Sequence, residues 1–145
     1  MNELRIGNLT VAVPIIQGGM GVGISLSGLA AAVANEGGVG VISSAGLGLL
    51  YKNYSGNLFE ASIHGLKDEI RKAREKTKGV IGVNVMVAMT NFVDMIKTSI
   101  AEKVDIIIAG AGLPLDLPSF LKKESVTRLV PIVSSARAAR IICEK

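Results

Sequence analysis

Near the N-terminus an apolar stretch, a glycine-rich turn and an alanine-rich segment follow one another directly, and this order constrains the fold more than any other feature. The stretch covers residues 14–17, the turn residues 18–23, and a helix is expected over residues 25–35. A strand that enters a helix through glycines leaves backbone N–H groups open at its carboxyl end, where α/β proteins build their sites. The order therefore predicts an α/β protein and makes this turn a candidate ligand site.

The rest of the chain repeats the alternation of apolar strands and amphipathic helices that is typical of a parallel sheet. Strands are expected at residues 39–43, 80–86, 104–109 and 129–133, helices at 59–77, 91–102 and 118–122, a last helix from about 134–135, and a long loop at 44–58. With the first strand this makes four complete β–α units and the start of a fifth. Two architectures fit: an open doubly wound sheet, or the N-terminal half of a (β/α)8 TIM barrel.

Composition narrows the function classes. Hydrophobic residues make up 49% of the chain, but many glycines interrupt the longest apolar segment, residues 18–50, so we expect buried strands and no membrane span. The net charge of +4 is spread over the helices and aromatic residues are only 3%, which argues against nucleic-acid binding. One cysteine and no secretory signal favour the cytoplasm.

The glycine turn has two interpretations when it is taken alone. Its backbone could approach a flat or anionic ligand, or the glycines could serve only a tight strand-to-helix connection. The turn does not have the G-x-G-x-x-G spacing of dinucleotide-binding folds, and Ser43 and Ser44 stand where such folds place an acidic residue. Classical NAD binding is therefore disfavoured.

Polar or flexible residues mark three further strand ends. Asn84 interrupts an apolar strand, where a buried amide is costly unless it is hydrogen-bonded. Because Asn84 lies near the carboxyl end of its strand, we favour a ligand contact over a bond to neighbouring backbone. Gly110 and Gly112 follow the next strand and could present N–H groups or simply turn the chain. Ser134 and Ser135 follow the last strand, and either could cap a helix, contact a cofactor, or do both.

Catalytic side chains are scarce. His64 is the single histidine and is expected on the surface of a helix, far from the strand ends. Cys143 is expected to be buried packing and not a nucleophile. One histidine and one cysteine cannot build a zinc site, so no metal is expected.

Taken together, the strand ends resemble the nitronate monooxygenase family, formerly called 2-nitropropane dioxygenases, which includes FMN-dependent enoyl-acyl carrier protein reductases. The matching segments are residues 14–20 (PIIQGGM), 37–43 (GGVGVIS), 82–86 (GVNVM), 110–114 (GAGLP) and 133–135 (VSS). They span nearly the whole chain in order. The resemblance implies that residues 1–145 are a partial FMN-binding TIM-barrel domain.

The resemblance also implies roles for particular residues. The backbone of Gly19, Met20 and Gly21 would contact the isoalloxazine, and Asn84 would bond the flavin or its ribityl chain. The other implied cofactor contacts are Gly110, Gly112 and Ser134. The family's catalytic histidine and phosphate-binding glycines would lie beyond residue 145, so no catalytic residue is assigned.

Three functions follow as expectations. The first is an FMN-dependent oxidoreductase that oxidises alkyl nitronates, and the second is an FMN-dependent enoyl-acyl carrier protein reductase with a nicotinamide donor. The third is a non-catalytic half barrel that assembles with itself or another chain through exposed edges. A compact doubly wound domain that binds another phosphate-bearing ligand is a weaker alternative.

Overall fold

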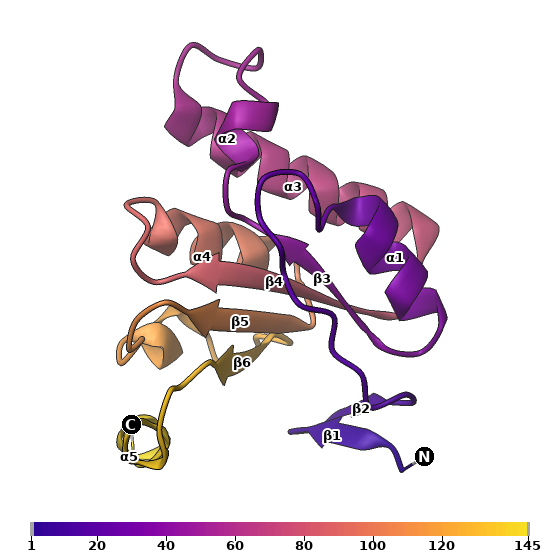
Figure 1. Ribbon diagram of the computed structural model, residues 1–145, viewed down its shortest axis with the longest axis vertical. Coiled ribbons are helices and arrows are strands. Elements are labelled where there is room, and N and C mark those ends of the chain that lie inside the picture. The colour runs from indigo at the N-terminus through magenta and orange to yellow at the C-terminus, as the bar shows by residue number, and fades with distance from the viewer. Residues whose placement is uncertain (1, 145) are drawn as a thin grey trace.

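The computed structural model describes residues 2–144, which form an α/β fold around a four-stranded parallel sheet (Figure 1). The strands of this sheet are β3 (Val39–Ser43), β4 (Val80–Met86), β5 (Ile106–Gly110) and β6 (Arg128–Pro131). The helices are α1 (Ser27–Asn35), α2 (Leu47–Leu50), α3 (Leu58–Lys76), α4 (Phe92–Ala101) and α5 (Ala136–Cys143), and a 3-10 turn, η1, covers Leu117–Phe120. Most of these elements begin and end within two residues of the predicted bounds.

The strand order separates the two predicted architectures. The strands are neighbours in the order β3-β4-β5-β6, without a reversal anywhere in residues 2–144. Helices α1, α3 and α4 all pack on the same face of the sheet, in one apolar cluster (Figure 1). A doubly wound fold has helices on both faces and binds its ligand where the strand order reverses. The doubly wound alternative is therefore wrong, and the arrangement is that of part of a TIM-barrel-like domain.

Both faces of the sheet are buried, and the side chains of β4 show the alternation. Ile81, Val83 and Val85 point into the cluster beneath the helices, where they meet Leu66 and Ile96. The residues between them belong to the opposite face, where Val80 joins a second apolar cluster that includes Val39, Val41, Ile106 and Ile108. Burial on both faces explains why these strands are continuously apolar.

An N-terminal hairpin, which the sequence analysis did not predict, covers this second face. Strands β1 (Leu4–Ile6) and β2 (Leu9–Val11) pair antiparallel (Figure 1). Their apolar side chains join the second cluster. The Arg128 side chain of β6 donates a hydrogen bond to Asn8 in the hairpin turn. The alternating Leu and Ile residues around Gly7–Asn8 are a recognisable hairpin signal.

Two predicted elements differ from the structure. The predicted strand at residues 14–17 forms only a single parallel bridge, between Ile16 and Val39, because the main chain turns away at the first glycine. The predicted loop at residues 44–58 contains the short helix α2, which packs on α3.

The side chain of Cys143 is exposed, so the prediction that it is buried packing is wrong. Cys143 is the last residue of α5, and no residue of that helix is buried within the described part of the chain. In residues 2–144 no helix is long and apolar enough to cross a membrane. The longest, α3, has 19 residues and a charged outer face.

Candidate functional site

A hollow lies at the carboxyl ends of the strands, where the glycine turn meets the sheet. Its volume is about 490 Å³, within the range of ligand sites. The lining residues come from the turn and the residues before it, from β4 and β5, and from the end of β6 and the residues after it: Ile16, Gln17, Gly18, Gly19, Met20, Asn84, Ile108, Val130 and Ile132. The strand register explains this meeting, because Asn84 pairs with Ile108 and Ile108 with Val130 in one row across the sheet.

Asn84 is the polar side chain of this row. Its amide Nδ2 donates to the carbonyl oxygen of Gly19 at 3.2 Å, while its side-chain oxygen Oδ1 accepts no hydrogen bond from any residue in 2–144. Its backbone oxygen accepts from both the N–H and the hydroxyl of Ser44, each at 3.0 Å. The Nδ2 group of the amide is thus hydrogen-bonded to the turn, and its Oδ1 is left to accept a hydrogen bond from a ligand.

Gly19 packs against Asn84 so closely that no side chain fits. A Cβ on Gly19 would lie 2.5 Å from the Cβ of Asn84 and 2.7 Å from its Nδ2. At Gly18, by contrast, a Cβ would meet no atom within 4 Å. Gly19 is therefore required by a close backbone approach, whereas Gly18 borders open space.

Some backbone polar groups of the turn are hydrogen-bonded within the protein, and others are open, that is, without a hydrogen-bond partner in residues 2–144. The N–H of Met20 donates to the Ser25 hydroxyl at 2.9 Å, and its carbonyl oxygen accepts from the Ser25 N–H at 3.0 Å. Within residues 2–144 the N–H groups of Gly18, Gly19 and Gly21 donate no hydrogen bond. The side chain of Met20, 63% exposed, extends from this wall. Open amide N–H groups beside an apolar wall can bind the polar edge of a flat ligand.

A second hollow of about 350 Å³ adjoins the first and contains two more predicted residues. Gly112 and Ser134 line it, and Ile132 lines both hollows. Ser135 is the N-cap of α5, because its hydroxyl accepts from the N–H of Ala138 at 3.2 Å. Of the alternatives left open by the sequence, the structure thus assigns the helix cap to Ser135.

Two predicted contacts lie outside both linings. A Cβ on Gly21 would lie 3.1 Å from the Cβ of Ala45, so this glycine packs against the loop after β3. At Gly110 a Cβ would lie 3.0 Å from Ile132, whose side chain leans over that position. The structure thus gathers Gly19, Met20 and Asn84 in one hollow, and Gly21 and Gly110 shape its surroundings.

Sequence reasoning missed the apolar wall of the hollow. Ile108, Val130 and Ile132 lie on the same face as Asn84, which two-residue alternation along neighbouring parallel strands could have shown. It also missed Gln17 and Ser25, whose side chains hydrogen-bond to each other, to the backbone of β3 and to the backbone of the turn. No local pattern marks those two, because their partners depend on how the turn folds back.

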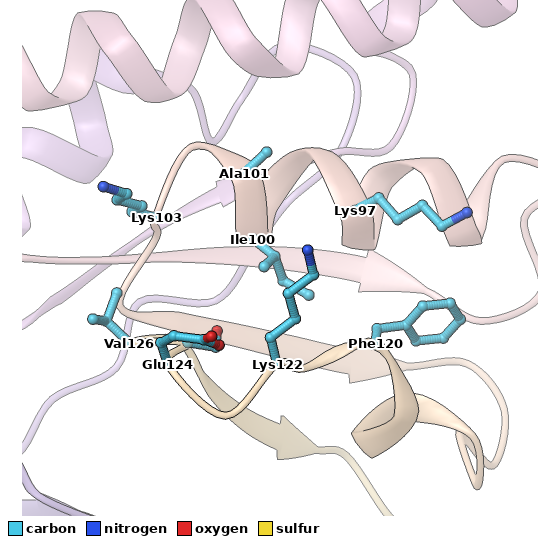
Figure 2. A pocket seen from close by; sticks show the side chains of 9 residues that line it. Lys97, Ile100, Ala101, Lys103, Phe120, Lys122, Glu124 and Val126 are labelled. Atoms are coloured by element: carbon cyan, nitrogen blue, oxygen red, sulfur yellow. The ribbon is translucent and has the colours of Figure 1, made fainter.

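A larger cavity lies at the opposite end of the sheet. It measures about 640 Å³, between α4 and the segment that leads into β6 (Figure 2). Lys103 precedes β5 and Val126 precedes β6, so the cavity is at the amino ends of these strands. Figure 2 shows Lys122 reaching over Ile100 in an open groove. Parallel α/β folds place their chemistry at the carboxyl ends, so we assign the site to the smaller hollow.

A separate polar cluster ties α1, α2 and α3 together. Glu69 is 4% exposed and accepts hydrogen bonds at 2.7 Å from the Ser27 N–H and from the Tyr51 hydroxyl. The Tyr51 hydroxyl also bonds Asp68 at 2.6 Å, and Lys72 pairs with Asp68 at 2.5 Å. The cluster is closed upon itself and does not line the site.

The ionisation of this cluster follows from its contacts. Burial alone would raise the pKa of Glu69, but the hydrogen bonds from Tyr51 and Ser27 hold that pKa below its ordinary value. Burial and the two carboxylates raise the pKa of Tyr51 strongly, so its hydroxyl stays protonated. His64, on the same helix, stacks on Tyr54 with ring centroids 3.6 Å apart. It is half-buried in this helix layer, and not fully on the surface as predicted.

No group of three His, Cys, Asp or Glu side chains in residues 2–144 lies close enough to share a metal ion. The site as described therefore consists of an amide, a hydroxyl, open backbone N–H groups and an apolar wall. This donor set suits an organic ligand with polar edges.

Comparisons with known proteins bear on the family and the fold of the chain. A sequence profile described as nitronate monooxygenase matches residues 2–145. The structure of FabK from Thermotoga maritima is similar at 30% identity and a TM-score of 0.75, over 92% of this chain and 38% of that one. A nitroalkane oxidase from Streptomyces ansochromogenes is similar in fold, at 19% identity and a TM-score of 0.74, over 92% and 44%. No curated protein sequence matches significantly. The chain thus spans less than half the length of either structure.

Proposed function

This chain belongs to the nitronate monooxygenase family, and on that premise we propose that it is the N-terminal part of an FMN-dependent oxidoreductase that oxidises alkyl nitronates. The observation that carries the proposal is the hollow at the strand ends, where open glycine N–H groups and Asn84 adjoin an apolar wall. We also propose that the domain is part of a (β/α)8 barrel whose remaining strands lie beyond residue 145.

The residues of the hollow fit a flavin ring. The isoalloxazine is flat and largely apolar, with hydrogen-bonding atoms along one edge, and it needs apolar faces and a few placed polar groups. Ile108, Val130 and Ile132 supply the apolar wall. Gly18 borders the hollow with no atom within 4 Å of the position that a Cβ would take, so backbone and ring can approach closely there.

Each polar residue then has a role. The N–H groups of Gly18 and Gly19 donate to the polar edge of the ring, and Asn84 accepts through Oδ1 while its Nδ2 holds Gly19. Ser134 and Gly112, in the adjoining hollow, contact the ribityl chain. Met20 contacts the ring through its exposed side chain, because its backbone groups are bonded to Ser25. The flavin supplies the redox chemistry, and these residues bind it, orient it and exclude water.

A second substrate class has an observation in its favour. FabK, an enoyl-acyl carrier protein reductase, is 30% identical to this chain, compared with 19% for the nitroalkane oxidase. The alternative is therefore reduction of an enoyl thioester by a nicotinamide donor through the flavin. Anaerobic mixing of the complete protein separates the two, because a nitronate would bleach the flavin in one case and a nicotinamide donor in the other.

The cofactor assignment is tested by FMN titration of the complete protein and its Asn84→Ala variant. Loss of the amide should weaken FMN binding about tenfold, because one ligand contact and the brace on Gly19 disappear together. Asn35→Ala is the matched control, since its amide donates to the Lys76 carbonyl oxygen at 3.3 Å on the protein surface. Equal FMN affinity in the two variants would overturn the role of Asn84, and a complete, folded protein that binds no FMN would overturn the cofactor assignment.

Exposed apolar side chains support self-association as a further part of the proposal. Ile16, which bridges to β3, and Ile132, which directly follows β6, are 43% and 52% exposed. Unpaired strand edges with apolar side chains favour pairing with a second copy. Light scattering of the purified chain should show a mass above that of a monomer, and Ile132→Lys should lower it.

A further inference from the structure

We propose that Gln17 and Ser25 are positioning residues that fix the backbone of residues 18–20 as the polar wall of the site. The inference rests on the proposed function, because it assigns these side chains to the site where the flavin would bind. Neither residue belongs to a strand or helix, and both act through hydrogen bonds to backbone on either side of the turn. Three steps lead to it.

The first step is that the Gln17 side chain continues the sheet after the main chain has left it. The main chain pairs with β3 as far as Gln17, whose N–H donates to Val39 at 3.0 Å. At Val41 the side-chain amide takes over: Oε1 accepts from the Val41 N–H at 3.2 Å and Nε2 donates to its carbonyl oxygen at 3.1 Å. An amide side chain has the same donor and acceptor as a peptide group, so it can replace one in the ladder.

The second step is that the Ser25 hydroxyl makes three hydrogen bonds, two of them to the backbone of the turn. Its Oγ accepts from the Met20 N–H at 2.9 Å and from Gln17 Nε2 at 3.1 Å, and it donates to the Gly18 carbonyl oxygen at 3.3 Å. This uses the one donor and both acceptor positions of a hydroxyl group. Ser25 is 1% exposed, so water does not compete for these bonds. Its carbonyl oxygen also accepts from Ser43 at 2.9 Å, which anchors it to β3.

The third step joins these bonds to the site. The segment between Gln17 and Ser25 contains four glycines, and glycine loses more conformational freedom on ordering than any other residue. Without the two side chains the turn would sample many conformations, and the Gly19 carbonyl oxygen would seldom meet Asn84. With them, the wall is ordered before a ligand arrives, and pre-ordering strengthens binding.

The test compares two buried hydroxyl deletions in the complete protein, Ser25→Ala and Ser99→Ala. Ser99 is fully buried and its hydroxyl bonds the Met95 carbonyl oxygen within α4, away from the site. A merely structural role for Ser25 predicts similar unfolding midpoints and equal FMN affinity in the two variants. The positioning role predicts FMN binding about tenfold weaker in Ser25→Ala alone, as expected when a binding wall must first be ordered.

Amide hydrogen exchange without FMN gives a readout that does not depend on the proposed function. The Met20 amide should be protected in the parent chain and in Ser99→Ala, and should exchange at least about tenfold faster in Ser25→Ala. Faster exchange with no FMN binding by any variant would support the positioning role and overturn the cofactor assignment. Unchanged exchange would overturn the positioning role, whatever the FMN result.

Gln17 provides the second pair of variants if Ser25→Ala proves too unstable. Gln17→Glu retains the oxygen that accepts from Val41 and loses the two N–H bonds, whereas Gln17→Met loses all three. Met20 exchange should accelerate in both and more in Gln17→Met. Protection equal to that of the parent chain in both variants would contradict the proposal.

Discussion

Two polar regions of this molecule differ in how fully they satisfy their own hydrogen bonds. In the cluster of Tyr51, Asp68, Glu69 and Lys72 each polar side chain has a partner inside the protein. Around the glycine turn the N–H groups of Gly18 and Gly19, as well as Oδ1 of Asn84, have none within residues 2–144. The first region joins helices, and the second borders a hollow.

This difference distinguishes polar groups that hold the fold together from polar groups that are available to a ligand. Buried polar groups are costly unless bonded, so a closed cluster ties elements together and leaves nothing for a ligand. A region that keeps donors and an acceptor open beside an apolar wall is arranged for a partner that the protein alone does not supply. The two regions should therefore respond differently to substitution, one in stability and the other in ligand binding.

The largest effect is expected from Gly19→Ala, a substitution in the glycine turn, where polar groups lack partners. The new methyl group would meet Asn84 at 2.5 Å, so the turn or β4 must shift. We expect FMN binding to fall more than about tenfold and the free energy of unfolding to drop by about 1–3 kcal/mol. Titration with FMN and urea unfolding measure the two effects.

Gly28→Ala is the matched control for this prediction, because a Cβ there meets no atom within 4 Å and the position lies in α1. Alanine favours a helix over glycine, so the control should keep or slightly raise the unfolding free energy. FMN affinity in Gly19→Ala equal to that of Gly28→Ala would contradict the described contact.

A smaller effect, confined to stability, is expected from Glu69→Gln in the closed cluster. One of two buried acceptors becomes a donor, so the unfolding free energy at neutral pH should fall by about 1–2 kcal/mol without a change in FMN affinity. The pKa of Glu69 is held below its ordinary value of 4.5 in the folded state. Its stabilising contribution is therefore present above that value and is lost as pH falls through the lower folded-state pKa.

Urea unfolding between pH 7 and pH 3 measures this difference. The parent chain should lose stability on acidification more steeply than Glu69→Gln, whose position 69 no longer titrates. Asp68 also has a lowered pKa, so part of the acid dependence should persist in the variant. Parallel stability curves for the two chains would show that Glu69 does not contribute in this way.

The smallest effect is expected from His64→Ala. The substitution removes the stack on Tyr54 and the edge contact with Tyr51, which together are worth about 1 kcal/mol or less. His64 does not line the site, so FMN affinity should equal that of the parent chain. A large loss of FMN binding would show that the helix layer and the site are coupled more tightly than their geometry indicates.

Much of the fold was readable from local patterns. The predicted helix at residues 59–77 is α3, Leu58–Lys76, because apolar residues recur at helical spacing and a charged face accompanies them. The predicted strand at 80–86 is β4, and its one polar residue, Asn84, lines the site. Such patterns depend on neighbouring residues alone, so the sequence contains them in full.

Other features were decided only when distant segments met. The Gly19 contact joins residues 65 positions apart, and the Gln17 amide finds Val41 across 24 positions. Gly19 and Gly21 look alike in the sequence, yet one packs on Asn84 beside the hollow and the other packs on Ala45.

The sequence by itself determined the alternation of strands and helices, the family, and the turn and Asn84 as candidate site elements. The tertiary structure alone decided the hairpin's place on the second face of the sheet, the cap at Ser135, and the exposure of Cys143. The physical reason is that periodicity and turn chemistry are local, whereas burial and hydrogen-bond partners depend on which elements pack together.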